Sequence, residues 1–248
     1  ILEPVRTVAD LSSLSLDGLH ERVAPVYETV SRLAAELPNN VTLIGFAGAP
    51  WTVATYMVEG RGSRDHGIVK QWAYGDPEGF GQLIDLLVTA TVEYLSKQVE
   101  AGAEVIQLFD TWAGALSETA FQRWCVEPVQ RIVRDLHQKH PGLPIIGFPR
   151  GVGAGYGSFA QLAGVNGVSL DWTVPLQWAR DEVQSQVTVQ GNLDPRLAVV
   201  GGKAMEGEAH RILETLGQGP FVFNLGHGFV PETPPEHVGR LAEILRGD

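Results

Sequence analysis

The stretch GFAGAPWTVATYMVEG at residues 45–60 is the part of the sequence that says most about the fold. The apolar run that leads into it has the length and the β-branched content of a fully buried strand. The small residues that follow allow backbone to approach a ligand closely, and Pro50 ends the strand. Trp51, Tyr56 and Glu59 then bring large or ionisable side chains to the point where we expect the strand to pass into a loop. Ligands bind at this end of the strands in barrels and in open α/β sheets, so the stretch is a candidate site.

Further short apolar runs follow along the chain, and longer segments with helical periodicity separate them. The repeated alternation of strand and helix predicts parallel strands joined by right-handed crossovers. The predicted strands are residues 41–47, 103–110, 143–149, 166–172, 186–192 and 220–226.

Three of the intervening segments carry clear helix signals. Apolar residues recur every three or four positions over residues 19–37, where Pro25 is expected to kink or restart the helix. Asp76 and Pro77 have the types preferred at the N-cap and first position of a helix, and they open the helix that precedes the second strand. A third helix is predicted within residues 117–142.

The fold class follows from the strand ends and the strand count. No GxGxxG motif follows any strand, and most strands end in polar or small residues, which favours a barrel over a doubly wound sheet. The chain opens with a helix, and its six predicted strands fall short of eight. We therefore predict a distorted (β/α)8 TIM-type barrel of the α/β class, with residues 1–248 as one domain whose N-terminal strand or strands are missing from this chain.

Composition excludes several classes of protein. A single cysteine rules out a disulfide framework, and a net charge of −11 argues against a nucleic-acid partner. There is no apolar run near 18 residues and no signal-peptide pattern, so we expect a cytoplasmic protein without a membrane partner. The sequence begins with Ile rather than Met, which suggests a fragment or a processed product.

Residues able to do chemistry follow the predicted strands. Tyr56 follows the first strand, Thr111 the second and Arg150 the third, while His227 follows the last and lies between two glycines that expose its imidazole. In a barrel these strand ends meet at one mouth. Structural roles remain open for all four, with Tyr56 as an interface aromatic, Thr111 as a turn cap, Arg150 as a solvated loop cation and His227 as a structural histidine.

The acidic residues and the cysteine at these positions have simpler interpretations. Asp110 is a candidate acid, Asp171 a buried hydrogen-bonded carboxylate, and Asp194, just before a proline, an N-cap. Cys125 has the spacing of a helical core residue rather than of a nucleophile. The remaining histidines are expected on polar helix faces or loops, and none pairs with Cys or Glu at metal-ligand spacing, so no metal site is predicted.

Several motifs in one order resemble uroporphyrinogen decarboxylases, and the resemblance runs nearly end to end. The opening stretch is one of them. The others are Gln107–Gly114 (QLFDTWAG), Val168–Thr173 (VSLDWT), Gln190–Pro195 (QGNLDP), Asn224–Gly228 (NLGHG) and Pro231–Val238 (PETPPEHV).

This resemblance implies a fold, a reaction and a set of site residues. It implies a homodimeric, distorted (β/α)8 barrel that uses no metal or organic cofactor and binds a tetrapyrrole. The reaction removes CO₂ from the four acetate side chains of uroporphyrinogen and gives coproporphyrinogen in haem biosynthesis. By the same resemblance Tyr56, Thr111 and His227 bind the substrate, and Tyr56 and His227 are the catalytic groups.

The chain also departs from the family pattern. The arginine-bearing motif that meets substrate carboxylates and the strand-end aspartate that faces the pyrrole nitrogens are both expected before Ile1. Arginines near the predicted mouth are few, with Arg61, Arg64 and Arg150 among them. We therefore expect the parent protein to be a carboxy-lyase and the 248-residue chain alone to be inactive and poorly stable.

Two alternatives stay open. A corrinoid- or thiol-dependent methyltransferase has a related barrel, but such enzymes activate thiols with zinc held by His and Cys, and the chain has one cysteine. A non-catalytic tetrapyrrole-binding protein would keep the same cleft. Metal analysis tests the first alternative, and the sequence upstream of Ile1 tests the second.

Overall fold

The computed structural model describes residues 3–60 and 63–247. The chain divides into two compact units, which are described separately below. Unit 1 comprises Ile1–Val152 and Leu162–Val165, and unit 2 comprises Gly153–Gln161 and Asn166–Asp248. The interpretation of the chain as one domain stays a prediction.

Three parallel strands form the sheet of unit 1. They are β1 (Ile44–Gly48), β2 (Val105–Asp110) and β3 (Ile145–Pro149). In register, Gly48 lies opposite Phe109, and Asp110 lies opposite Pro149. The carboxyl ends of the three strands therefore lie at the same edge of the sheet, where the sequence placed Tyr56, Thr111 and Arg150.

Three more parallel strands form the sheet of unit 2. They are β4 (Gly167–Ser169), β5 (Thr188–Leu193) and β6 (Phe221–Leu225). All six predicted strands are confirmed, although the fourth is shorter than predicted. Strand β4 ends early because Asp171 turns the chain, its carboxylate accepting a hydrogen bond from the backbone N–H of Thr173 at 2.9 Å.

Helices connect the strands in the order that the sequence predicted. They are α1 (Leu19–Glu36), α2 (Pro50–Glu59), α3 (Gly67–Gly75), α4 (Pro77–Glu100), α5 (Glu118–Phe121), α6 (Glu127–Lys139), α7 (Gly155–Leu162), α8 (Leu176–Trp178), α9 (Pro195–Val200), α10 (Gly202–Leu216) and α11 (Pro235–Arg246). Short 3₁₀ segments span Val8–Ser13 and Ala113–Ala115, and π-helical turns span Gln122–Val126 and Ala179–Gln184. Within residues 3–60 and 63–247, no helix is long and apolar enough to cross a membrane.

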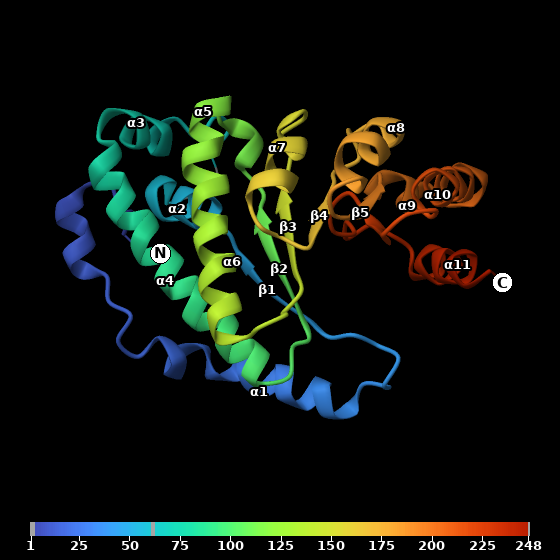
Figure 1. Ribbon diagram of the computed structural model, residues 1–248, viewed down its shortest axis with the longest axis horizontal. Helices are drawn as coiled ribbons and strands as arrows, with labels where there is room; N and C mark the ends of the chain where they lie inside the picture. Colours follow the sequence, from blue (N-terminus) through green and yellow to red (C-terminus); the bar gives the residue numbers. More distant parts are fainter. Residues whose placement is uncertain (1–2, 61–62, 248) are drawn as a thin grey trace. The chain divides into compact units, whose positions relative to one another are not determined.

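Helices α4 and α6 lie side by side in unit 1 (Figure 1). The predicted cap of α4 is confirmed, because the Asp76 carboxylate accepts a hydrogen bond from the Gly79 N–H at 2.9 Å. The buried stripe of α6 includes Ile132 and Leu136, and at its end the His140 Nε2 and the Ser96 Oγ of α4 are 2.6 Å apart. Apolar burial and this hydrogen bond hold the two helices together.

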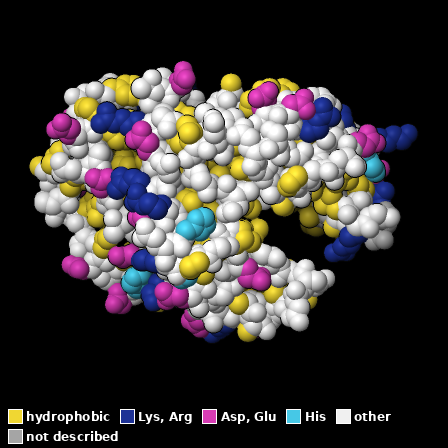
Figure 2. Space-filling view, viewed as in Figure 1, with side chains coloured by type: hydrophobic (Ala, Val, Ile, Leu, Met, Phe, Trp, Pro, Cys, Tyr) yellow, Lys and Arg dark blue, Asp and Glu magenta, His cyan; other side chains and the backbone are white. Residues whose placement is uncertain are grey.

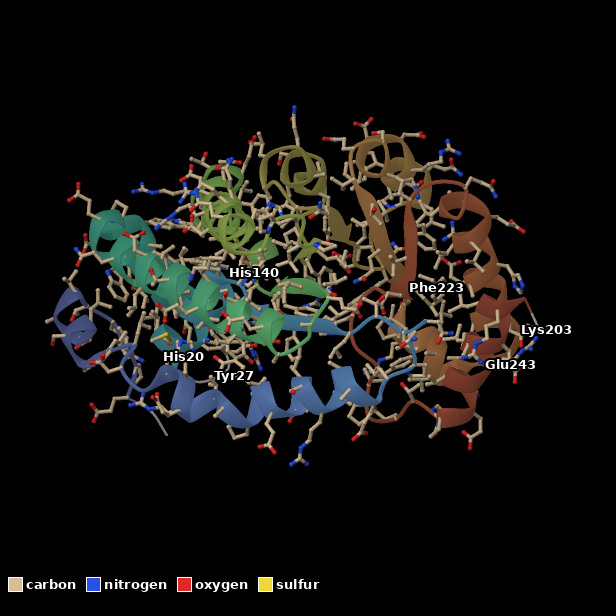
Figure 3. All side chains as sticks on the ribbon, turned by 60° about the horizontal axis from the view of Figure 1, so that its bottom comes forward. His20, Tyr27, His140, Lys203, Phe223 and Glu243 are labelled. Carbon is tan, nitrogen blue, oxygen red and sulfur yellow. The ribbon has the colours of Figure 1, made fainter. Side chains whose placement is uncertain are left out.

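Helix α1 packs against α4 through aromatic and polar side chains. Figure 3 shows His20 and Tyr27 on α1, and the ring of Tyr27 lies 6.0 Å from that of Tyr94 on α4. His20 Nδ1 and the Tyr27 hydroxyl are 3.0 Å apart. Contrary to the possibility that Pro25 restarts the helix, α1 runs through it as one element.

Residues 50–59 form helix α2, so the expectation of a loop after the first strand is wrong. Pro50 occupies the first turn, where its missing N–H costs nothing, and the buried Trp51 fixes the helix to the core. Gly60 ends the helix in the left-handed region at φ 71°. The segment that looked like an aromatic turn is therefore a rigid element.

Candidate active site

The loop after β2 is anchored from two sides in unit 1. The backbone N–H of Trp112 donates to the Thr52 hydroxyl at 3.2 Å, and the Trp112 carbonyl accepts from the indole N–H of Trp51 at 3.0 Å. Both partners are buried on α2. Helix α2 therefore holds Thr111 and Trp112 in place, and the ring of Tyr56 lies 6.2 Å from the Trp112 ring on the same side.

Asp110 is the buried residue that supports this arrangement. Its Oδ1 accepts a hydrogen bond from the Thr52 hydroxyl at 2.6 Å. Burial raises the pKa of Asp110 from the ordinary value of 3.8 to about 6, although hydrogen bonding to Thr52 and the nearby Cys125 thiol oppose the rise. Since the side chain is only 2% exposed, Asp110 acts on the site through Thr52 rather than by contact with a ligand.

Cys125 is a core residue, as its helical spacing predicted. It is buried in the π-helical turn, and burial together with the nearby Asp110 raises the pKa of its thiol well above the usual value. A thiol held in the neutral form is a poor nucleophile and a poor metal ligand.

Glu59 has a structural role, not the site role that its position suggested. One carboxylate oxygen accepts hydrogen bonds from the backbone N–H groups of Ile68 at 3.0 Å and Val69 at 3.1 Å. Glu59 therefore binds two of the free N–H groups in the first turn of α3 and ties that helix to the end of α2.

A pocket of about 360 Å³ opens at the strand ends of unit 1. Thr111 and Trp112 form one side, and Arg64 and Arg150 also line it. The remaining lining residues are Asp65, His66, Lys70, Gly114, Ala115 and Gly151. Two of the three arginines expected near the mouth are thus present at one cavity, whereas Arg61 lies outside the described residues.

Two loops of the pocket wall are joined backbone to backbone. Arg150 donates its N–H to the carbonyl of Asp110 at 3.1 Å, and Gly114 donates to the carbonyl of Arg150 at 3.0 Å. A Cβ at Gly114 would lie 2.5 Å from the carbonyl oxygen of Gly151, so only glycine permits this approach. The loops after β2 and β3 therefore form one rigid wall.

His66 contributes to the pocket in a way the sequence did not predict. It was expected on a polar helix face or in a loop, and it does precede α3, but it is buried, and its ring centroid lies 4.8 Å from that of Trp112. Burial lowers the pKa of His66 below its ordinary value, although nearby Glu59 opposes the change. The residues around His66 in the sequence are mostly polar and gave no sign that its side chain is buried. The burial depends on the contact with Trp112, which is distant in the sequence.

Strand β1 departs from the expectation of complete burial. Its burial alternates, and Phe46 is 60% exposed while its ring packs edge-to-face on Phe109 with centroids 5.9 Å apart. Described residues of unit 1 cover one face of β1 and leave the Phe46 ring accessible. Sequence reasoning missed Phe46 because a continuous apolar run does not show which face is covered.

The strand ends of unit 2 position His227. The His227 side chain is exposed, and its Nδ1 accepts a hydrogen bond from the N–H of Gly228 at 2.7 Å. A Cβ at Gly226 would lie 2.4 Å from the backbone nitrogen of Trp172, so the loops after β4 and β6 touch. His227 therefore projects from a closely packed corner of unit 2.

Asp171 and Asp194 have the structural roles that the sequence predicted. Asp171 is buried and accepts a hydrogen bond from the Tyr156 hydroxyl at 2.8 Å. Asp194 caps α9, where its carboxylate accepts from the N–H of Arg196 at 2.8 Å. Among residues 3–60 and 63–247, no group of three or more His, Cys, Asp or Glu side chains is arranged to hold a metal ion.

The predicted site residues thus fall into two sets. In unit 1, Thr111 lines the pocket together with Trp112, and the ring of Tyr56, which is 54% exposed, lies 6.2 Å from the Trp112 ring. His227 lies at the end of β6 in unit 2. Thr111 and His227 lie in the loops after β2 and β6, as predicted, whereas Tyr56 lies in helix α2, which follows β1.

This chain is similar in sequence to known proteins over nearly its whole length. A family model described as uroporphyrinogen decarboxylase (URO-D) matches residues 1–247. A uroporphyrinogen decarboxylase from Rhodospirillum rubrum is 54% identical over 99% of this chain and 71% of its own length. Those from Mesorhizobium japonicum and Paracoccus denitrificans are each 49% identical over 99% of this chain, covering 71% and 72% of their own lengths.

Among solved structures, a methyltransferase from Methanosarcina mazei has a similar fold. The TM-score is 0.77 at 19% identity, over 93% of this chain and 66% of that protein. This likeness concerns the fold alone. With its parallel strands and alternating helices, the chain has an α/β fold of the TIM-barrel type, as predicted. The identity to curated relatives and the match over residues 1–247 show that the chain belongs to the uroporphyrinogen decarboxylase family.

Proposed function

We propose that this chain acts in the decarboxylation of the four acetate side chains of uroporphyrinogen, which gives coproporphyrinogen in porphyrin and haem biosynthesis. The observation that carries the proposal is the 54% identity to a named uroporphyrinogen decarboxylase over 99% of the chain. The positions of Thr111 and His227 in loops after strands, and of Tyr56 on the helix that follows β1, support it, because catalytic groups of TIM-type barrels lie beyond the carboxyl ends of the strands.

The substrate itself supplies the electron sink. A proton adds to a pyrrole ring carbon and makes a cation. The bond between the acetate methylene and its carboxylate then breaks, CO₂ leaves, and the electron pair neutralises the ring cation. The exocyclic methylene takes up a proton to become a methyl group, and the ring carbon returns its proton. For each acetate the net change is uptake of one proton and release of one CO₂, without a metal or organic cofactor.

The protein then has to bind the macrocycle and move protons. We assign the proton transfers to Tyr56 and His227, whose hydroxyl and imidazole can donate and accept protons, and both side chains are exposed. We assign substrate binding to these two residues and to Thr111, which lines the pocket of unit 1. Helix α2 and the loop after β2 hold Tyr56 and Thr111 in fixed positions, which favours catalysis by orientation.

A turnover assay tests this function. In a restored enzyme, the residues of the Rhodospirillum rubrum relative that lie outside the matched region are added to this chain. We expect the restored enzyme to convert uroporphyrinogen to coproporphyrinogen, as followed by chromatography of the oxidised products. The same assay on the 248-residue chain checks the prediction that it is inactive alone. A restored enzyme that binds uroporphyrin but forms no coproporphyrinogen would support a non-catalytic binding protein instead.

We also propose a homodimer in the cytoplasm. Family membership supports both parts of this proposal, and the acidic composition with a single cysteine fits a reducing compartment. Light scattering after size exclusion measures the mass of the restored enzyme in solution. A monomer at micromolar concentration would contradict the proposed dimer.

A further inference from the structure

The pocket of unit 1 concentrates positive charge in an acidic chain. Arg64, Lys70 and Arg150 line it, and Asp65 is the only carboxylate among the described lining residues. The whole chain carries −11, and on the face drawn in Figure 2 the Lys and Arg side chains lie among Asp and Glu side chains. The pocket is therefore a local exception to the charge of the chain.

The charge of the pocket comes from these cations and not from the histidine. Burial keeps the pKa of His66 low, so its ring is neutral at pH 7. Its ring packs on Trp112 at 4.8 Å and forms part of the wall. Neither Arg64 nor Lys70 forms an ion pair within 4.0 Å with any described residue.

The cations are mounted on a rigid frame. Lys70 lies in the first turn of α3, which Glu59 fixes through two backbone hydrogen bonds. His66, just before that turn, donates its backbone N–H to the Ser63 hydroxyl at 3.0 Å. Arg150 belongs to the wall that Gly114 closes. The backbone that carries these cations therefore needs little rearrangement when an anion binds.

Two buried polar atoms in the same wall have no hydrogen-bond partner among the described residues. His66 is 94% buried, its exposed fraction being 6%, and its Nδ1 has no hydrogen-bond partner among the described residues. The indole Nε1 of Trp112, next to it in the wall, is also unpartnered within the described part of the chain. Buried polar atoms in native structures usually find a partner, so this wall is built for a polar ligand.

We infer that Arg64 and Lys70, with Arg150 beside them, bind a propionate carboxylate of the tetrapyrrole. This inference rests on the proposed function. Uroporphyrinogen carries acetate and propionate side chains, and only the acetates lose CO₂. A cation paired with an acetate would stabilise that carboxylate in the ground state and lose the interaction as CO₂ forms, which would slow the reaction. The propionates keep their charge throughout, so cations can hold them without this penalty.

Binding of two stable porphyrins tests the inference. Uroporphyrin carries four acetates and four propionates, whereas coproporphyrin carries methyl groups in place of the acetates. Fluorescence titration gives the Kd of each porphyrin for the restored enzyme and for its double variant Arg64→Gln/Lys70→Gln. Arg134→Gln/Lys139→Gln is the matched control, because it removes the same charge from exposed positions on α6. Arg64→Lys/Lys70→Arg keeps the charge, and circular dichroism confirms that each variant is folded.

The propionate assignment has one expected pattern. The pocket variant should weaken binding of both porphyrins by at least about tenfold and by the same factor, while the control changes it by less than about twofold. Loss confined to uroporphyrin would place an acetate in the pocket and overturn the assignment. If the pocket variant bound both porphyrins as tightly as the wild type, the pocket would not be part of the substrate site, and the proposed decarboxylase function would be unaffected. If the restored enzyme bound neither porphyrin, this inference would be overturned, whereas the proposed function would still be decided by the turnover assay.

Discussion

At the residue scale, Asp110 shows how a buried acid can support a site that it does not touch. Its carboxylate accepts a hydrogen bond from the Thr52 hydroxyl, and the same hydroxyl oxygen accepts a hydrogen bond from the backbone N–H of Trp112. The Thr52 hydroxyl thus donates one hydrogen bond and accepts another, and together these two bonds fix the orientation of its side chain. Asp110 therefore sets the position of the loop that carries Thr111, at the cost of a carboxyl group held in an apolar environment.

This cost predicts a pH dependence of stability. The pKa of Asp110 rises from 3.8 to about 6 on folding, so between these values the folded state binds more protons than the unfolded state. Stability from this group is present below pH 4 and is lost as the pH rises through 6, by about 3 kcal/mol in total. Urea denaturation across pH 4–8 should show this loss in the wild type but not in Asp110→Asn, which keeps an oxygen for Thr52. Asp17→Asn, at an exposed position, serves as the control. A free-energy difference between wild type and Asp110→Asn that stays constant with pH would contradict the prediction.

Tyr56 offers a matched pair for testing proton transfer. Tyr56 is 54% exposed and Tyr74 on α3 is 53% exposed, so removal of either hydroxyl disturbs packing equally little. In the restored enzyme, Tyr56→Phe should lower kcat by about 10²-fold or more, because the ring stays while the proton-carrying group is lost. Tyr74→Phe should leave kcat unchanged. Steady-state kinetics with uroporphyrinogen give both values. Equal rates for Tyr56→Phe and wild type would remove Tyr56 from the proton path.

At the scale of elements, strands and caps could be predicted from local sequence. The apolar runs marked six strands, and Asp76 with Pro77 marked the start of α4, because these signals depend on neighbouring residues alone. Helix α2 was missed, because Pro and two aromatic residues after a strand also fit a turn. Its helical form is fixed by burial of Trp51 against the loop after β2, which is a contact across the fold.

The candidate site was predictable to a similar degree. Thr111 and His227 could be found because they directly follow strands. His66 and Lys70 could not, since they precede and begin a helix, and they reach the pocket only because Glu59 fixes α3 beside Trp112. Local patterns place residues at strand ends, whereas contacts between elements decide which helix ends join them.

Glu59 provides a prediction at this scale. Glu59→Ala leaves the N–H groups of Ile68 and Val69 without their buried acceptor, so it should lower the free energy of unfolding by about 2 kcal/mol. Glu59→Gln retains an acceptor oxygen and should lose less. Glu78→Ala removes an exposed acid from the first turn of α4 and should change stability by less than about 0.5 kcal/mol. Urea denaturation measures all three. The cap assignment fails if Glu59→Ala is no less stable than Glu78→Ala.

At the scale of the whole molecule, the path of the chain links the two units. The chain enters unit 2 at Gly153, returns to unit 1 at Leu162 and passes again into unit 2 at Asn166. Helix α7 (Gly155–Leu162) belongs to unit 2 except for its last residue, Leu162, which is assigned to unit 1. Neither unit is a single continuous segment, because the chain passes from one unit to the other three times.

We therefore expect the chain to unfold in one cooperative transition, in keeping with the prediction of one domain. Cys125 is the only cysteine and is 1% exposed, so its reaction with a thiol reagent reports the opening of unit 1. In a second protein, Cys125→Ala combined with Ala209→Cys moves the thiol to a buried position of α10 in unit 2. For each protein, the urea midpoint of thiol labelling is compared with the midpoint of its own far-ultraviolet circular dichroism. This internal comparison removes any change in stability that the substitutions cause.

Coincident midpoints in both proteins are expected for a two-state transition. If the thiol in one unit became reactive at a lower urea concentration than the loss of circular dichroism, that unit would open by itself, and the interpretation as one domain would be wrong.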